Sequence, residues 1–257
     1  MKSIILCEGI DDAYILGYYL HKTSDNPQWI PVEDAEKFAH SYNLAKKNSR
    51  NQRVNVYKRN EDRAAIWCVG GKDNFKRPLK DIKKFCEMFP EERVDNVFLI
   101  TDRDENEIEV CIRSFENLLL NAGWSVQLEN NRKSKIFYTV EDTAYALNIF
   151  PIIIPFDEQG ALETVLMNGI AGEGEEEALI VSKAIIYVQS LLESKKIDKY
   201  LQHKRHVLKS KFSAVIAVTN PDRATATFDT LLMTHEWENK GEINKHFHLL
   251  RDILNQG

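Results

Sequence analysis

Short apolar runs alternate along the first half of the chain with segments in which apolar residues recur every three or four positions. Consecutive apolar residues are typical of strands buried on both faces, and they open the segments 3–7, 64–71 and 96–106. Helical spacing occurs at 11–21, 77–89 and 107–121. Strands that alternate with helices predict an α/β fold, with a parallel sheet flanked by helices.

The other segments are less regular. Residues 53–59 alternate between apolar and polar and predict an edge strand or a hairpin arm, while 124–128 and 135–140 are compatible with a pair of strands. The run at 145–155 is apolar but holds two prolines, and from about 160 onward the pattern is mainly helical. We therefore expect a sheet domain at 1–170 and a mainly helical C-terminal extension at 171–257 that packs on it.

Acidic residues follow two of the expected strands directly. The run IILC leads into Glu8, Gly9 and Asp12, and the run VFLIT leads into Asp102 and Asp104. Each acid alone is also compatible with the capping of a following helix. Open α/β sheets, however, bind ligands at the carboxyl ends of their strands, and alternate side chains of an extended segment share a face. Oxygen ligands gathered at this edge suit Mg²⁺ or Mn²⁺ better than zinc.

The joint pattern, a strand with EGxxD followed further along by a strand with DxD, resembles the Toprim domain of topoisomerases, bacterial primases, recombination mediators and OLD-family nucleases. The segment PFDEQGALETVL at 155–166 is similar to the G-x-LE segment of OLD-type Toprim domains. The turn VGGKDNF at 69–75 is similar to one in related stand-alone proteins of uncharacterised function. The resemblance extends over residues 1 to about 170.

The resemblance implies a Toprim-like, Rossmann-like sheet that runs metal-assisted chemistry on phosphodiester bonds. Glu8, Asp12, Asp102 and Asp104 would be metal ligands, with Glu163 completing a second metal site. Glu8 would act either as a ligand or as the general acid or base. A catalytic lysine could offset the negative charge on the phosphate, and Lys209 and Lys211 are the two candidates. The alternative is that both lie on a solvated basic helix without a catalytic role.

Two departures from the family pattern change the expectation. The spacing between EGxxD and DxD exceeds that of a minimal Toprim domain, and an insertion at 25–62 would account for it. The phosphate-binding signature GxxxxGK[ST] of the ATPase that full-length OLD nucleases carry is missing from the sequence. We expect a stand-alone Toprim protein, with a separate ATPase or repair protein as a further partner and an oligomer left open.

The basic residues are unevenly distributed, although the net charge is −5. Residues 37–60 contain seven Lys or Arg and no acid, and residues 199–211 contain five and no acid. Such blocks are either solvated faces or a phosphate-binding surface for DNA or RNA. The candidate nucleic-acid-binding residues are Lys46, Lys47, Arg50, Arg53, Lys58, Arg59, Lys204 and Arg205. Trp29, in the expected insertion, is a candidate for base stacking or a partner contact, whereas Trp67, Trp124 and Trp237 are expected in the core.

Composition narrows the class of protein. Hydrophobic residues make up 43% of the 257 and charged residues 28%, as in ordinary globular proteins. No apolar run approaches the roughly 20 residues that span a bilayer, so no membrane association is expected. The four cysteines form no CxxC pair, which favours reduced thiols in a cytoplasmic protein over a zinc site.

Three functions compete at this point. The first is a Mg²⁺-dependent nuclease of the OLD-like Toprim type, acting on DNA or RNA. The second is a non-catalytic protein of the same fold that binds nucleic acid or a partner in repair or defence. In the third, the DxD motif is that of a nucleotide-sugar transferase or of a haloacid-dehalogenase-like phosphatase. The phosphatase motif needs Thr or Val where this chain has Asn106, and neither enzyme of the third class explains EGIDD.

Overall fold

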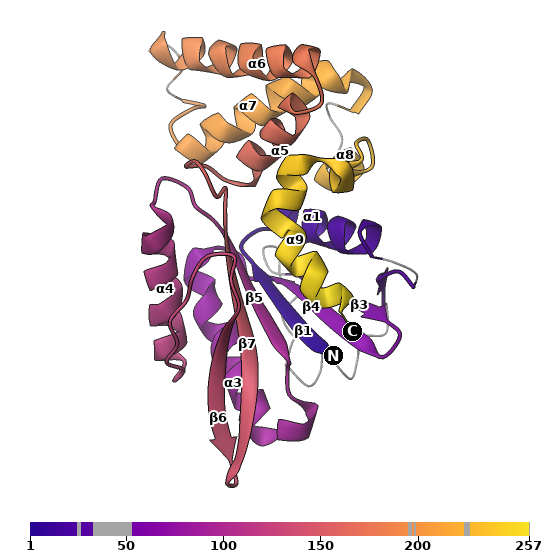
Figure 1. Cartoon of the computed structure of the whole chain (residues 1–257). Helices are drawn as coiled ribbons and strands as arrows, with labels where there is room; N and C mark the ends of the chain where they lie inside the picture. Colours follow the sequence, from indigo (N-terminus) through magenta and orange to yellow (C-terminus); the bar gives the residue numbers. More distant parts are fainter. Residues whose placement is uncertain (25–26, 33–52, 195–196, 198, 224–226, 257) are drawn as a thin grey trace.

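The computed structural model describes residues 1–24, 27–32, 53–194, 197, 199–223 and 227–256, and these residues form a seven-stranded sheet flanked by helices (Figure 1). The order of the strands is β2-β3-β4-β1-β5-β7-β6. The central four run parallel and are β4 (Asp62–Cys68), β1 (Lys2–Cys7), β5 (Asn96–Asp102) and β7 (Thr143–Ile154). Three antiparallel strands complete the edges: β2 (Ile30–Pro31), β3 (Arg53–Arg59) and β6 (Ser134–Val140). The predicted α/β class is confirmed.

Helices cover both faces of the sheet and gather beyond its carboxyl end (Figure 1). One face carries α1 (Ile10–Lys22) and α9 (Gly241–Asn255), and the other carries α3 (Lys76–Met88) and α4 (Ile108–Asn121). Beyond the carboxyl ends of the strands lie α5 (Leu162–Ala171), α6 (Glu175–Glu193) and α7 (Lys204–Thr219), with the short α8 (Phe228–Leu232) beside α1. Turns of 3₁₀ helix stand at η2 (Lys72–Phe75), η3 (Pro90–Glu92), η4 (Pro221–Arg223) and η5 (Trp237–Asn239).

The core follows from the alternation of side chains along each buried strand. In β1, Ile4 and Leu6 pack against α3 and α4, whereas Ile5 and Cys7 face the layer of α1 and α9. The second layer continues without a break from the sheet into the helices at its carboxyl end, through Val165, Val181 and Val215. The three tryptophans expected in the core are buried, as are all four cysteines.

The strand β7 corrects two expectations. Its twelve residues are continuous despite Pro151, and it pairs with β6, the strand that was expected to pair with the segment 124–128; that segment is not a strand. The carbonyl of Pro151 accepts a hydrogen bond from the backbone N–H of Asn131, 2.8 Å away. The side of Pro151 that lacks an N–H therefore faces the loop before β6, so the ladder with β5 loses no bond.

Trp29 corrects a third expectation. Its side chain is completely buried, and the guanidinium of Arg59 lies 5.4 Å from the centre of its ring. Its carbonyl contacts the ring nitrogen Nδ1 of His21 at 2.7 Å, and its N–H donates to the Ser24 hydroxyl at 3.0 Å. Trp29 is part of the packing between α1 and the sheet edge and is not a surface for bases.

No helix in the described part of the chain combines the length and the apolar character needed to cross a membrane.

Close packing of α1 on β3 generates a test of the fold. A methyl group at Gly17 would overlap the hydroxyl of Tyr57. We expect Gly17→Ala to lower the free energy of unfolding by about 1–3 kcal/mol, since overpacking outweighs the gain in helix propensity of about 1 kcal/mol. In a Tyr57→Ala background the same substitution should cost nothing, and chemical denaturation of the four proteins measures the cycle. An equal loss in both backgrounds would contradict the packing.

Candidate functional site

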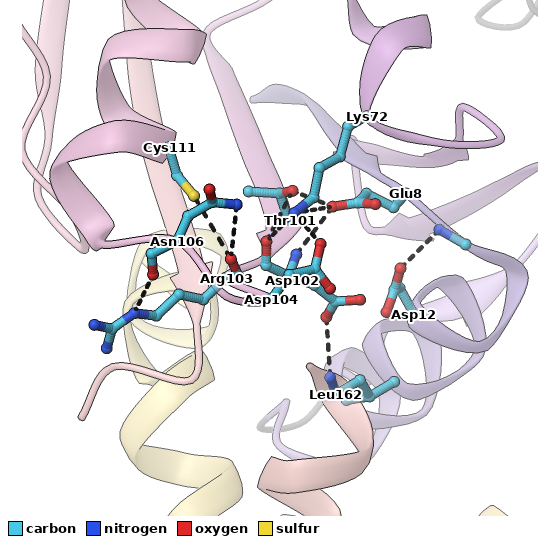
Figure 2. A network of polar contacts seen from close by, with 11 residues as sticks. Glu8, Asp12, Lys72, Thr101, Asp102, Arg103, Asp104, Asn106, Cys111 and Leu162 are labelled. Carbon is cyan, nitrogen blue, oxygen red and sulfur yellow. Dashed lines mark hydrogen bonds and ion pairs between the residues drawn. The ribbon is translucent and has the colours of Figure 1, made fainter. Parts of the chain in front are cut away.

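Four chain segments meet at the carboxyl edge of the sheet (Figure 2). Glu8 follows β1, the turn Gly70–Gly71 follows β4, and Asp102 ends β5. The loop after β7 leads into α5, which begins at Leu162. Because the strands β4, β1, β5 and β7 are parallel neighbours, their ends deliver these groups to one place. The structure therefore brings together the acids that the sequence had singled out.

Glu8 and Asp102 are joined through the pairing of β1 with β5. Cys7 lies opposite Ile100, so the next residue on each strand is Glu8 and Thr101. The Glu8 carboxylate accepts hydrogen bonds from the Thr101 hydroxyl and, at 3.1 Å, from the backbone N–H of Asp102. Its side chain is only 15% exposed. Glu8 is thus fixed at the centre of the edge and aimed at the DxD segment.

Asp12 faces the same edge from the first turn of α1. Its carboxylate accepts a hydrogen bond of 2.7 Å from the backbone N–H of Gly9, the residue at the start of the helix. This is half of a capping box and satisfies one N–H of the turn. The capping role and the position at the acidic edge are therefore compatible, since only one carboxylate oxygen is used by the cap.

The backbone of Asp104 ties the DxD segment to the loop before α5. Asp104 has a left-handed backbone, with φ of 54°, so the extended geometry expected for DxD ends at Asp102. Its N–H and carbonyl exchange hydrogen bonds of 2.6 and 2.8 Å with Gly160. Gly160 has φ of 153°, and a Cβ there would overlap Thr164, so glycine is required.

This bridge positions the start of α5. The backbone N–H of Leu162 donates to the Asp102 carboxylate at 2.9 Å, which places a negative charge at the positive end of the helix dipole (Figure 2). The next side chain, Glu163, is 14% exposed. The sequence G-x-LE thus has a direct structural meaning: the glycine makes the bridge, the leucine N–H holds Asp102, and the glutamate joins the edge.

Two lysines supply positive charge among these acids. Lys72, from the turn after β4, forms ion pairs with Asp104 and, at 3.8 Å, with Glu8, and donates to the carbonyl of Asp102 at 2.7 Å. Lys209, from α7, lies 3.1 Å from Asp11 and 3.3 Å from Glu163. Lys209 was one of the two lysines expected at the site. Lys72 and Thr101 were missed, although Lys72 stands in the turn VGGKDNF that carried part of the family resemblance.

Burial and crowding of like charges raise the affinity of the acids for protons. Burial, followed by the charges of Asp12 and Glu8, raises the pKa of Asp102 well above its ordinary value. Burial likewise raises the pKa of Asp12 to about 7 and that of Glu8, although Thr101 and Lys72 partly offset the effect on Glu8. For Lys72 and Lys209, the neighbouring acids outweigh burial and raise the pKa. Asp12 thus keeps its proton up to about pH 7, and a cation bound at the edge would compete with protons for these acids.

The donor set fits a hard cation, but in its present arrangement it is not a closed cage. Among the described residues, no three acidic, histidine or cysteine side chains converge on one point as metal ligands do. Glu8, Asp12 and Asp102 are engaged with backbone N–H groups, and Asp104 with Lys72. Mg²⁺ keeps several waters and needs only one or two carboxylates, so an all-oxygen edge of this kind suits it better than zinc.

The acids open onto two hollows that share part of their lining. A cleft of about 880 Å³ lies between the edge and α7, and its walls include Glu8, Asp102 and Asp104 on one side and Lys204, Arg205 and Lys211 on the other. A smaller cavity of about 380 Å³ lies toward Asp11, Asp12 and the Gly70–Gly71 turn. Glu8, Asp102 and Glu163 border both hollows. A ligand in the cleft would thus lie between a negative floor and a positive wall.

The basic residues proposed to bind nucleic acid differ in their exposure. Lys204 and Arg205 are exposed beside the cleft, where Lys204 pairs with Glu105, and Lys58 is exposed on β3. Arg59 is a correction: it is 6% exposed, pairs with Asp62 at 3.5 Å and donates to the Asn255 side chain at 3.0 Å, so it stabilises the fold and is not available to phosphate. Arg53 begins β3. Lys46, Lys47 and Arg50 lie outside the described residues.

Residues 2–254 match a family described as a protein of unknown function (DUF3226). The chain belongs to this family. In fold, it is similar to the hypothetical protein PH0156 from Pyrococcus horikoshii OT3, with a TM-score of 0.51 and 15% identity over 99% of this chain and 98% of that one. At this identity the likeness shows a shared fold alone. No curated protein matches the sequence. The function of this DUF3226 protein must therefore be argued from the chemistry of its site.

The raised pKa of Asp12 predicts how stability depends on pH in the absence of divalent ions. The unfolded carboxyl loses its proton near its ordinary pKa of 3.8, whereas the folded one keeps it until about pH 7. The folded state binds more protons in this window, so stability should fall as pH rises from about 4 to 7. Asp12→Asn removes this cost, because an amide oxygen can still accept from Gly9. We expect the variant to melt higher than the wild type at pH 8 in EDTA, with the difference vanishing near pH 4. Thermal unfolding that gives a constant difference would contradict this.

Proposed function

We propose that this protein is a Mg²⁺-dependent enzyme that cleaves phosphodiester bonds of nucleic acid, a nuclease of the OLD-like Toprim type. The observation that carries the proposal is the meeting of five acids from three chain segments at one sheet edge, opposite a wall with lysine and arginine. The five acids are Glu8, Asp12, Asp102, Asp104 and Glu163. The motifs that hold them, EGxxD, DxD and G-x-LE, occur in the order that resembles Toprim proteins, and the cleft beside them is large enough for a nucleotide-sized ligand.

In this proposal the residues of the edge have three roles: metal binding, proton transfer and stabilisation of phosphate charge. A bound Mg²⁺ or Mn²⁺ would polarise the phosphate oxygens and lower the pKa of an attacking water. Asp102 and Asp104 would hold the ion on the β5 side, and Asp12 and Glu163 on the α1 and α5 side. Glu8, whose pKa is raised by burial, is the acid suited to take and return a proton during the reaction. Lys72 and Lys209 would offset negative charge that develops on the phosphate.

A second candidate is favoured by the ion pair between Lys72 and Asp104. A resident ammonium group that occupies the acid needed for metal would leave a protein that binds nucleic acid, or a partner such as an ATPase or a repair protein, without cleaving it. The two candidates differ in one measurable property, because the enzyme needs a divalent ion at the edge and the binding protein does not.

A cleavage assay separates the candidates. Labelled single- and double-stranded DNA and RNA are incubated with the protein in Mg²⁺ or Mn²⁺. We expect at least one of these substrates to be cleaved. Asp102→Asn should slow cleavage by about 100-fold, because a charged ligand of the ion is lost while the amide oxygen can still accept from the Leu162 N–H. The matched control is Asp142→Asn, in the turn between β6 and β7, where φ of 66° suits asparagine as well as aspartate. Equal rates for the two variants, or no cleavage by the wild type, would reject the enzyme.

Lys72 should affect metal affinity and cleavage in opposite directions. Lys72→Met removes a positive charge next to Asp104 and Glu8, so Mn²⁺ should bind about fivefold to tenfold more tightly, as expected for the loss of one unit of repulsion in a partly exposed site. Cleavage should nevertheless slow by about 10-fold or more, because charge on the phosphate is no longer offset. Calorimetry and the nuclease assay measure the two effects, and Lys72→Arg, which keeps the charge, is the control. A parallel loss of both would assign Lys72 a purely structural role.

A further inference from the structure

A second row of positive charge begins next to the acidic edge and plays no part in the proposed chemistry. Residues 72–84 contain six Lys or Arg and two Asp, in a chain whose net charge is −5. Lys72 of this segment reaches into the edge, and the rest form η2 and the first turns of α3. The segment was not among the basic blocks singled out in the sequence, because its charges alternate with the apolar residues of an amphipathic helix.

The charges of α3 lie on its solvent side. Lys76, Arg77, Lys80 and Lys84 are all exposed, with 78% of the Arg77 side chain accessible, while Leu79 and Ile82 are buried against the sheet. Positions 76, 80 and 84 are four residues apart, and 77 and 80 are three apart, so the four side chains share one face. They form a row that runs away from the acidic edge along the helix.

A hollow marks the start of this row. A cavity of about 450 Å³ is bordered by Asp73, Asn74, Lys76, Arg77 and Lys80, among others. The acids beside it do not cancel the charge: three basic residues border the hollow together with two acids, Asp73 and Asp81, of which Asp81 lies 3.9 Å from Arg77. The hollow, which more basic than acidic residues border, is thus suited to a bulky anion.

The turn between the two sites is open. The N–H groups of Gly70 and Gly71 both donate to the carbonyl of Glu8, at 3.0 and 3.1 Å, so the turn is held directly against the acidic edge. Both glycines border the cavity of about 380 Å³ that also contains Glu8 and Asp102. A Cβ at Gly71 would meet no atom within 4 Å, which shows open space above the turn. Asn74 donates to the Gly70 carbonyl at 2.8 Å, but the space above Gly71 is free, which leaves a place for a strand to cross between the acids and α3.

We propose that Lys76, Arg77 and Lys80 bind the sugar-phosphate backbone of a nucleic-acid strand that leaves the acidic edge across the Gly70–Gly71 turn. The row of charges matches the repeating charge of such a strand, and phosphate contacts of this kind position a strand without reading its sequence. The inference rests on the proposed function for what happens at the edge, but the surface on α3 is a binding site in its own right.

The length of the row sets the number of nucleotides. From Lys72 to Lys80 the chain advances through four residues of 3₁₀ helix and four of α-helix, roughly 14 Å in all at about 2.0 and 1.5 Å per residue. At a spacing of about 3.4 Å per nucleotide in a stacked strand, this corresponds to about four nucleotides. A strand that reaches only two or three nucleotides beyond the edge would not touch Lys80.

Binding by charge-reversed variants tests the surface. The variant Lys76→Glu/Arg77→Glu/Lys80→Glu is compared with Arg132→Glu/Lys133→Glu/Lys135→Glu, which makes the same change of charge at exposed positions before and within β6, on the other edge of the sheet. Fluorescence anisotropy with single-stranded oligonucleotides of 3 to 12 nucleotides, in Ca²⁺ to suppress cleavage, gives the affinities. Thermal unfolding verifies that both variants fold, and acids at the start of α3 are compatible with its dipole.

The expected result depends on length. With twelve nucleotides the α3 variant should bind about tenfold more weakly than the wild type, and the slope of log affinity against log salt should fall by about 2, or 0.7 for each of three phosphates. With three nucleotides, which reach Lys76 and Arg77 from the edge but not Lys80, the loss should be smaller, and the β6 variant should stay within about twofold of the wild type at every length. An α3 variant that binds like the wild type at every length, a loss that is the same at every length, an equal loss in the β6 variant, or no binding by the wild type would overturn the inference.

The inference and the proposed function fail separately. If the wild type binds as expected but cleaves nothing with Mg²⁺ or Mn²⁺, the nuclease is rejected and the α3 surface stands. If the wild type cleaves and Asp102→Asn does not, while the α3 variant binds twelve nucleotides normally, the nuclease stands and the α3 surface is rejected.

Discussion

The parallel pairing of β1 with β5 is the constraint on which the rest of the site depends. The register that sets Cys7 opposite Ile100 leaves the next residues, Glu8 and Thr101, side by side beyond the last shared pair. Glu8 then accepts hydrogen bonds from the Thr101 hydroxyl and from the N–H of Asp102. The Asp102 carboxylate in turn accepts a hydrogen bond from the N–H of Leu162, which fixes the start of α5. A shift of one residue in this register would turn Glu8 to the opposite face and disconnect the acids from one another.

Holding acids together in a half-buried edge is costly, and the fold offsets the cost with positive groups brought from distant parts of the chain. Lys72 comes from the turn after β4 and Lys209 from α7, and backbone N–H groups of Gly9, Asp102 and Leu162 supply the remaining partners. Repulsion between neighbouring acids is typical of sites that bind a cation or a phosphate, because an arrangement that favours binding lowers the stability of the empty site.

The parallel strands, their helices and the acids after them could be predicted from the sequence, because apolar runs and helical spacing are local signals. Other features depend on partners far along the chain. Arg59 is buried because it meets Asn255, 196 residues away, and no local pattern distinguishes it from the exposed Lys58. Pro151 suggested a break in β7 because its tolerance depends on which side of the strand lacks an N–H. Lys72 was missed because a single lysine in a turn carries no periodicity.

The two hydrogen bonds between Asp104 and Gly160 make a mechanical linkage out of two loops. A rotation of α5 about its first turn would be transmitted through Gly160 to the backbone of Asp104, and through the Leu162 N–H to the carboxylate of Asp102. Lifting α5 to enlarge the cleft would therefore dismantle the acids that the cleft serves. The contacts of α7 with the edge are of another kind, because it reaches the acids only through the long side chains of Lys204 and Lys209.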